Sequence, residues 1–311
     1  MYIALSVFSA VALAVLLLAY VTYRMIFSYG NGKCVDIYKG LDGEETERKK
    51  ESREAIERLK NAPFEKVEIT SYDGKILFGR YFHKSSAAPT VIAFHGYKSA
   101  SLRDMARASI EFETLGYNML LVDHRSHGGS EGRKITFGAR EKYDALAWVG
   151  YINSRFENPK IFLYGISMGA STVLMASALT GLKNVFGIIA DCPYSSPDAI
   201  IKEVMRSRRY PASLLFPFIR LGGIIFGGFD VKRHSAIEAV KNSDIPILLI
   251  HGEGDSFVPP SMSDEIYNAG KLKNKNISLV KIPEATHTLA IMFDRDNYVK
   301  SLTDFIDKAK E

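Results

Sequence analysis

Six short apolar runs constrain the fold of this 311-residue chain more than any other feature. Strands of a parallel sheet that is covered by helices on both faces have this character, because neither face meets water. Between the runs the sequence takes a helical period, as in residues 138–156. The chain is therefore predicted to be an α/β protein with a mostly parallel central sheet flanked by helices. The runs are TVIAFHG (90–96), YNMLLVDHR (117–125), KIFLYGIS (160–167), VFGIIADCP (185–193), IPILLIHG (245–252) and ISLVKIP (277–283).

One segment interrupts this alternation. Residues 196–243 form an insertion between two of the apolar runs that is long enough for about two helices. Residues 210–229 within it are more apolar than a surface helix should be. Pro211 and Pro217 break this stretch. The pattern predicts a helical lid over an apolar pocket, because such an insertion stands beside the carboxyl ends of the strands, where ligands bind in open α/β folds. A buried helix pair belonging to the core is the alternative.

The N-terminal residues 1–25 carry no charged side chain before Arg24 and are long enough for a helix that crosses a bilayer. A transmembrane anchor is predicted. A cleaved secretory signal is the alternative, although no basic residue precedes the apolar run and the run exceeds the usual signal-peptide core. Arg24, Lys33 and Lys39 follow the run, so the positive-inside rule predicts a single-pass membrane protein whose body faces the cytoplasm.

Two segments connect this anchor to the apolar runs. Residues 26–63 are dense in charge and carry only a thin apolar stripe of Ala55, Ile56 and Leu59, which predicts a solvated linker helix that ends before Pro63. Residues 66–83 then alternate apolar and polar side chains around a turn at 72–74, which is typical of a β-hairpin. The folded domain is expected to cover residues 64–311.

The amino-acid composition limits the classes of partner and cofactor that the chain is expected to bind. The chain has 47% apolar and 24% charged residues, and its net charge of +5 is scattered along the sequence, which gives no case for nucleic acid. Cys34 and Cys192 lie far apart in different contexts, so no disulfide framework is expected, and Cys192 is expected to be a buried structural thiol. No Cys/His cluster has the spacing of a zinc site, and no cofactor or metal is predicted.

The strongest chemical motif is Gly-Ile-Ser-Met-Gly at residues 165–169. Ser167 follows a predicted strand and precedes a predicted helix, which is the arrangement that holds a nucleophilic serine exposed on a sharp turn. A serine hydroxyl is a poor nucleophile at neutral pH, so it requires a base to accept its proton and a third group to orient that base. Ser167 is the candidate nucleophile if both are present.

The remaining strand ends supply both groups. His287 follows the last apolar run and precedes the C-terminal helix, and Asp255 lies just beyond the run before it. All three side chains are therefore expected at the carboxyl edge of the sheet, as a Ser167–His287–Asp255 triad.

Backbone amides of Tyr97 and Met168 are the candidate donors for an oxyanion hole, because one follows a strand end and the other follows Ser167. His95 and His251 are expected to be structural. His124 and His127 beside Asp123 could suggest a metal, but Arg and Glu in the same glycine-rich loop can pair with each other, and no third histidine is near.

With these residues in place, the chain resembles the alpha/beta-hydrolase superfamily from about residue 64 to the C terminus, and looks most like its membrane-anchored bacterial serine hydrolases, which are similar to esterases and lipases. The resemblance implies Ser167 as nucleophile, Asp255 and His287 as its partners, and the amides of Tyr97 and Met168 as oxyanion hole. Ser126 departs from the family pattern, since many members have glycine or alanine there. The similar segments are FHGYKS, DHRSHGGSEG, GISMGAS, ADCPYSS and HGEGDSFVP.

The sequence thus predicts a membrane-anchored serine hydrolase that cleaves carboxylic esters through an acyl-enzyme intermediate. The apolar insertion favours a substrate with an acyl chain, including a monoacyl lipid. Thioesters, and peptides cleaved by a serine aminopeptidase of the prolyl-oligopeptidase type, are alternative substrates for the same residues. A non-catalytic binding protein on the same fold is the alternative from another class.

Overall fold

A single eight-stranded sheet organises the computed structural model, which describes residues 2–30, 35–38, 41, 46–273 and 276–310. The strand order is β1-β2-β4-β3-β5-β6-β7-β8, with β3 to β8 parallel and β1 and β2 antiparallel. Each of the six apolar runs forms one parallel strand, and the predicted hairpin forms β1 and β2, so these predictions are confirmed. The strands are β1 (Glu65–Thr70), β2 (Ile76–Phe82), β3 (Thr90–Phe94), β4 (Asn118–Val122), β5 (Ile161–Ile166), β6 (Val185–Asp191), β7 (Ile247–Gly252) and β8 (Ile277–Ile282).

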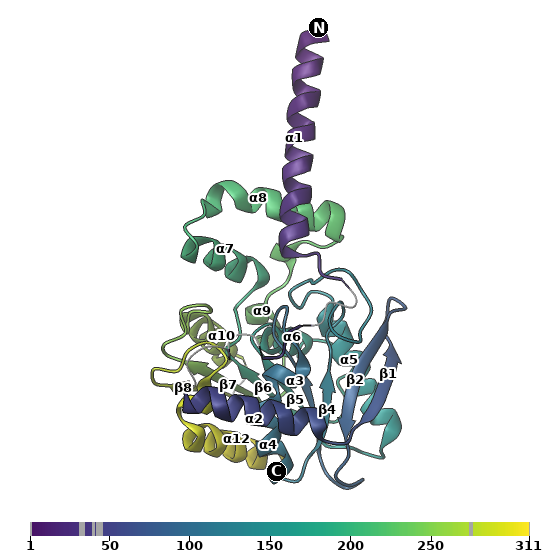
Figure 1. Cartoon of the computed structure of the whole chain (residues 1–311), viewed down its shortest axis with the longest axis vertical. Coiled ribbons are helices and arrows are strands. Elements are labelled where there is room, and N and C mark those ends of the chain that lie inside the picture. Colours follow the sequence, from purple (N-terminus) through teal and green to yellow (C-terminus); the bar gives the residue numbers. More distant parts are fainter. Residues whose placement is uncertain (1, 31–34, 39–40, 42–45, 274–275, 311) are drawn as a thin grey trace.

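Two hydrophobic cores, one on each face, explain why the parallel strands are apolar throughout. Ile92 and Phe94 of β3 enter one core, and Val91 and Ala93 enter the other. Helices cover both faces (Figure 1). The first core lies under α5 (Glu141–Arg155), α6 (Met168–Ala176), α9 (Ala236–Val240) and α10 (Ser261–Lys271), and the second under α2 (Glu47–Asn61), α3 (Ser101–Asp104), α4 (Ala106–Thr114), α11 (Ala290–Phe293) and α12 (Arg295–Lys310).

Helix α2 differs from the expected solvated linker. Its three apolar residues, Ala55, Ile56 and Leu59, are buried in the second core, and Arg58 forms an ion pair of 2.7 Å with Glu113 of α4. A stripe of three residues is narrow, but it is enough to hold a helix whose other faces carry charge. The helix is therefore part of the folded domain. Lys33, Cys34 and Lys39, which the sequence analysis used, lie outside the described residues.

Helix α1 (Tyr2–Ile26) extends away from the domain, and only its last turns contact other elements (Figure 1). It is long and apolar enough to cross a bilayer, a property that signal sequences share. Ala19 and Tyr23 are buried, whereas the residues before Ala19 are exposed or half-buried. The described N-terminal residues therefore form an apolar helix with a free segment and a packed segment.

The insertion at 196–243 forms α7 (Pro197–Ser207), α8 (Ala212–Gly222), a π-helical turn (Gly223–Gly227), a 3₁₀ turn (Val231–Arg233) and α9. Helices α7 and α8 lie above the sheet beside α1 (Figure 1). Helix α8 contacts α1 closely, since a Cβ atom at Gly222 would lie 2.3 Å from the carbonyl oxygen of Ala19. The role of the insertion as a lid stays a prediction.

Gly222→Ala is expected to separate α8 from α1, because the added Cβ meets backbone that cannot rotate away. Overpacking of this kind costs about 1 to 3 kcal/mol. Hydrogen exchange of the α8 amides through local opening should therefore accelerate by about 5- to 150-fold. Gly150→Ala is the matched control, because nothing lies within 4 Å of a Cβ at that helical position. Equal exchange of α8 in both variants would contradict the close contact.

Candidate active site

Ser167 occupies a strained turn between β5 and α6. Its backbone angles, φ of 55° and ψ of −113°, lie in a region that residues other than glycine rarely adopt. The Ser167 amide donates a 2.8 Å hydrogen bond to the carbonyl of Asp191 on β6. The two glycines of the motif are sterically required. A Cβ at Gly169 would lie 1.9 Å from the carbonyl oxygen of Phe94, and one at Gly165 would lie 2.4 Å from the backbone of Gly169. The turn therefore holds the Ser167 hydroxyl in a fixed place at the carboxyl edge of the sheet.

The structure brings the three predicted triad residues together. His287, in the loop after β8, places Nε2 3.0 Å from Ser167 Oγ and Nδ1 2.7 Å from Asp255 Oδ2. Asp255 lies in the loop after β7. Because β5, β7 and β8 are parallel, their carboxyl ends share one edge, and the three loops meet there. The catalytic roles of these residues stay a prediction, while their geometry is that of a hydrogen-bonded chain.

Asp255 is buried, yet it is surrounded by donors. Its Oδ1 accepts hydrogen bonds of 2.9 Å from the amides of Phe257 and Val258. Burial alone would raise the pKa of the Asp255 carboxyl, but hydrogen bonds from His251 and His287 outweigh burial and hold that pKa well below its usual range. Asp255 is therefore an anion at neutral pH.

His251 has a contact that the sequence analysis missed. As expected, it is buried and structural, with its ring bonded to Ser263 Oγ and the Val258 carbonyl. Its Nε2 also lies 3.4 Å from Asp255 Oδ2. His251 and Asp255 are only four residues apart in the sequence. This spacing could have indicated the contact, because a tight loop after the strand brings Asp255 back to the strand end.

The predicted oxyanion loop lies directly beside Ser167. A Cβ at Gly96 would be 3.5 Å from the Ser167 Cβ, which is ordinary contact distance. The amides of Tyr97 and Met168 have no recorded acceptor among the residues that the structure describes. An oxyanion requires such N–H groups as donors, so Tyr97 and Met168 stay the predicted oxyanion hole.

Buried histidines and an aspartate fix this loop. Asp104 Oδ2 accepts from the Gly96 amide at 2.7 Å, His95 Nδ1 lies 2.8 Å from the Gly96 carbonyl, and His127 Nε2 accepts from the Lys98 amide at 3.1 Å. Burial holds the pKa of His127 well below its ordinary value, so the ring is neutral and can accept this bond. His95 and His127 thus have structural contacts.

The oxyanion loop also contacts α1. The Tyr97 hydroxyl donates to the Ile26 carbonyl at 2.7 Å, and Lys98 Nζ donates to the Met25 carbonyl at 3.2 Å. These carbonyls belong to the last turn of α1, where no intrahelical donor reaches them. The end of the apolar helix is therefore tied to the loop that faces Ser167.

Ser167 opens into an apolar cavity of about 490 Å³. Its walls come from helix α1, from the insertion at 196–243 and from the rest of the domain, which sequence reasoning could not join because their contacts depend on the packed fold. Helix α1 contributes Thr22, Met25 and Ile26, α7 contributes Ile200, Ile201, Val204 and Met205, α8 contributes Leu215 and Ile219, and the domain contributes Tyr97, Phe137, Tyr194 and Phe257.

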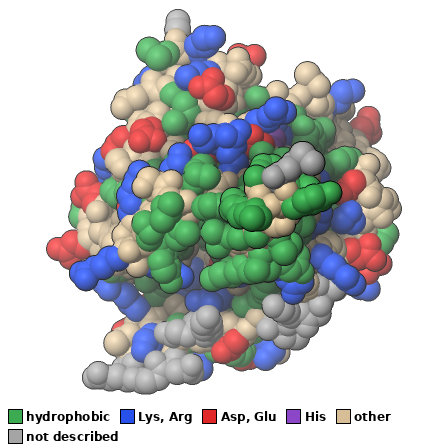
Figure 2. Space-filling model, turned by 90° about the horizontal axis from the view of Figure 1, so that it is seen from above, with side chains coloured by type: hydrophobic (Ala, Val, Ile, Leu, Met, Phe, Trp, Pro, Cys, Tyr) green, Lys and Arg blue, Asp and Glu red, His purple; other side chains and the backbone are tan. Residues whose placement is uncertain are grey.

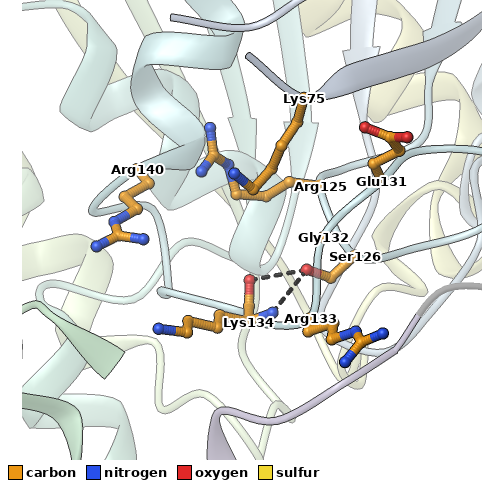
Figure 3. Close-up of a pocket in the computed structure, with 8 residues that line it drawn as sticks. All are labelled: Lys75, Arg125, Ser126, Glu131, Gly132, Arg133, Lys134 and Arg140. Carbon is orange, nitrogen blue, oxygen red and sulfur yellow. Dashed lines mark hydrogen bonds between the residues drawn. The ribbon is translucent and has the colours of Figure 1, made fainter. Parts of the chain in front are cut away.

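A second cavity of about 400 Å³ is lined mainly by basic side chains (Figure 3). Arg125 is bonded there to Asp144 and Asp73, and Lys134 Nζ donates to the Phe226 carbonyl of the π-helical turn. Ser126, which departs from the family pattern, bonds the backbone amide and carbonyl of Lys134 at 2.8 and 2.9 Å. These contacts fix the loop after β4 beneath the insertion.

Asp123 and His127, two of the three residues that could suggest a metal, have protein partners, whereas Nε2 of His124 is buried without a hydrogen-bond partner among the described residues. Asp123 accepts from Ser101 Oγ at 2.7 Å and from Arg80 at 3.3 Å. A different group, Cys192, Asp255 and His287, places possible ligand atoms within 4.8 Å of one another. Burial raises the pKa of the Cys192 thiol, which disfavours the thiolate that a metal needs. The arrangement fits a hydrogen-bonded triad better than a metal centre.

Comparisons with known proteins agree with this fold. The family model described as serine aminopeptidase, S33 matches residues 85–227, and the model of the prolyl oligopeptidase family matches residues 228–311. The uncharacterized protein YqkD of Bacillus subtilis is 26% identical over 305 residues, covering 97% of this chain and 96% of YqkD. Protein bem46 of Schizosaccharomyces pombe is 26% identical, covering 82% of this chain and 81% of bem46.

Among solved structures, the esterase Pf2001 of Pyrococcus furiosus aligns with a TM-score of 0.67 and 25% identity, covering 81% of this chain and 93% of the esterase. The mostly parallel sheet with a serine at the turn between β5 and α6 defines the class of α/β hydrolases. The chain belongs to the alpha/beta-hydrolase superfamily.

A buried acid beside the site gives a pH-dependent prediction. The Asp191 carboxyl accepts from the Tyr298 hydroxyl at 3.0 Å, and burial raises its pKa to about 6. Between pH 4 and 6 the unfolded chain has lost this proton and the folded protein keeps it, so this group lowers stability as pH rises through that window. Asp191→Asn removes the titration. The unfolding free energy of Asp191→Asn minus that of the wild type should therefore increase by up to about 3 kcal/mol between pH 4 and pH 7.

Urea unfolding of both proteins in the same detergent at a series of pH values measures this difference. Other titrating groups are shared by the two proteins, so their contributions cancel. A difference that stays constant with pH would show that Asp191 has an ordinary pKa.

Proposed function

We propose that this protein is a membrane-anchored serine hydrolase that cleaves carboxylic esters with an apolar acyl group. The observation that carries the proposal is the hydrogen-bonded chain from Ser167 through His287 to Asp255, which faces an apolar cavity. Esterase Pf2001, which has the same fold, supports the reaction class. The substrate class rests on the cavity wall.

In the proposed acylation step, His287 Nε2 accepts the proton of Ser167 Oγ as that oxygen attacks the ester carbonyl carbon. Nδ1–H of His287 remains bonded to the Asp255 carboxylate, which orients the ring and stabilises its charged form. The oxyanion of the tetrahedral intermediate accepts hydrogen bonds from the amides of Tyr97 and Met168. His287 then protonates the leaving alcohol oxygen, and the acyl group stays on Ser167.

Deacylation repeats the chemistry with water. His287 accepts a proton from a water molecule that attacks the acyl carbonyl, and the collapse of the second intermediate returns that proton to Ser167 Oγ. The products are a carboxylic acid and an alcohol. The free acid leaves through a cavity whose wall is mainly hydrocarbon.

The cavity wall favours esters over amino-terminal peptides. An aminopeptidase must hold the charged amine of its substrate, and carboxylates usually do this. Among the described residues, no Asp or Glu lines the cavity, while Lys98 and Arg208 do. This wall disfavours a cationic substrate, although the matching family models are named for peptidases. Thioesters remain compatible with the same wall and belong in the substrate panel.

The proposed anchor is α1, which would cross the bilayer once. Arg24 is exposed at the domain end of the helix, and the positive-inside rule then places the hydrolase domain on the cytoplasmic side. The proposed lid is formed by α7 and α8, because both line the cavity that contains Ser167.

Ser167→Ala is expected to abolish fluorophosphonate labelling and to lower kcat for p-nitrophenyl esters by about 10⁴-fold or more, because the nucleophile is gone. Asp255→Asn should keep the fold and lower kcat by about 10⁴-fold, since the ring loses its orienting anion. Ser154→Ala, on an exposed part of α5, is the control. Undiminished labelling of Ser167→Ala would refute the serine mechanism.

Met205→Trp is expected to shift the preferred acyl chain to a shorter one, because the larger ring fills part of the apolar cavity. The ratio of kcat/KM for lauroyl over butyryl esters should fall by about 10-fold or more. Glu203→Trp, on the same helix but outside the cavity lining, is the matched control. An unchanged ratio for Met205→Trp would place the acyl chain elsewhere.

A further inference from the structure

The position of α8 along α1 sets its depth relative to a bilayer. Helix α1 has 25 residues and is therefore about 37 Å long. The hydrocarbon core of a bilayer is about 30 Å thick, which corresponds to about 20 residues. A span that begins at Tyr2 thus ends near Val21, and α8 contacts α1 at Ala19 and Tyr23. Helix α8 would lie at the membrane boundary.

The outer side of α8 and of the following π-helical turn is apolar. Leu214 is 63% exposed, Ile224 43% and Ile225 48%. Seen from above, with α1 pointing toward the viewer, hydrophobic side chains gather in one area of the upper face of the molecule (Figure 2). The inner side of the same helix lines the cavity with Leu215 and Ile219. One helix therefore separates the cavity that contains Ser167 from an exposed apolar surface.

Basic and aromatic side chains border this surface. Arg208 and Arg209 are exposed in the turn between α7 and α8, and they have no carboxylate partner among the described residues. Tyr210 follows them and is 54% exposed. Lys and Arg side chains adjoin the hydrophobic area (Figure 2). Tyrosine is enriched at the level of lipid headgroups, and unpaired arginines complement anionic lipids.

We propose that α8 and the π-helical turn insert shallowly into the leaflet that α1 enters, so that an acyl ester reaches the cavity from the bilayer. This inference rests on the proposed function for its substrate. We assign the bilayer as the partner of this apolar face for three reasons. The face is continuous with α1, it lies at the depth where the span ends, and the basic side chains of Arg208 and Arg209 border it. The membrane-facing surface is Leu214, Ile224 and Ile225.

The depth of this surface can be measured in vesicles of phosphatidylcholine and phosphatidylglycerol that contain the full chain. An environment-sensitive fluorophore is attached to Leu214→Cys in a Cys34→Ser background, where the remaining native thiol, Cys192, is buried. Leu272→Cys is the matched control, since Leu272 is 82% exposed at the end of α10. Spin-labelled lipids should quench the probe at 214 at least about 3-fold more than the probe at 272.

Two results would overturn the proposal. Quenching by aqueous iodide that is equal at 214 and 272 would place α8 in water. A probe at 214 that neither iodide nor the spin-labelled lipids reach would show that a protein surface, including a second copy of this chain, covers α8.

Activity then tests the route of the substrate. Leu214→Glu combined with Ile225→Glu should lower hydrolysis of a monoacylglycerol dissolved in the vesicles by about 10-fold and leave hydrolysis of soluble p-nitrophenyl acetate unchanged. Leu272→Glu should change neither. Equal rates on the vesicle substrate for the double variant and the wild type would refute entry from the bilayer, whereas undiminished activity in Ser167→Ala would refute the serine mechanism instead. If the double variant does not fold, the quenching at 214 decides.

Discussion

The close approach of α6 to β3 is the constraint on which the rest of the site depends. The carbonyl of Phe94 lies where a Cβ of residue 169 would be, so only glycine allows the first turn of α6 to sit against the neighbouring strand. This packing places the strained Ser167 backbone beside Gly96. Tyr97 and Met168, the predicted oxyanion donors, directly follow Gly96 and Ser167 in the chain. A single steric requirement thus positions both the Ser167 backbone and the loop that carries the predicted oxyanion donors.

The second requirement is electrostatic. A buried carboxylate is costly, and the fold compensates Asp255 with two backbone amides and two imidazoles. Because these donors come from its own loop, from β7 and from the loop after β8, the anion also ties those segments together. Removing the charge would therefore weaken both the orientation of His287 and the hydrogen bonds that join these segments, without unfolding the domain.

The parts that the sequence predicted are those with local signals. An apolar run indicates a strand that is buried on both faces. Because the loops after parallel strands lie at the same edge of the sheet, the sequence alone predicted that Ser167, Asp255 and His287 lie close together. The packing of α2 was missed because its three buried residues form a weak stripe, and their partners on the second core lie far along the chain. The contact of Gly222 with Ala19 has no local signal, since a glycine in an apolar helix is equally consistent with flexibility.

The junction between α1 and the domain joins these features. The carbonyls of Met25 and Ile26 accept hydrogen bonds from Lys98 and Tyr97, whose backbone forms the loop beside Ser167. The same turn of α1 supplies part of the cavity wall. A helix that served only as a tether could be joined by any linker, and its end would need no contact with the site. Here the last turns of α1 are structural parts of the cavity, so α1, if it spans a bilayer as proposed, would also set the height of the site above the membrane.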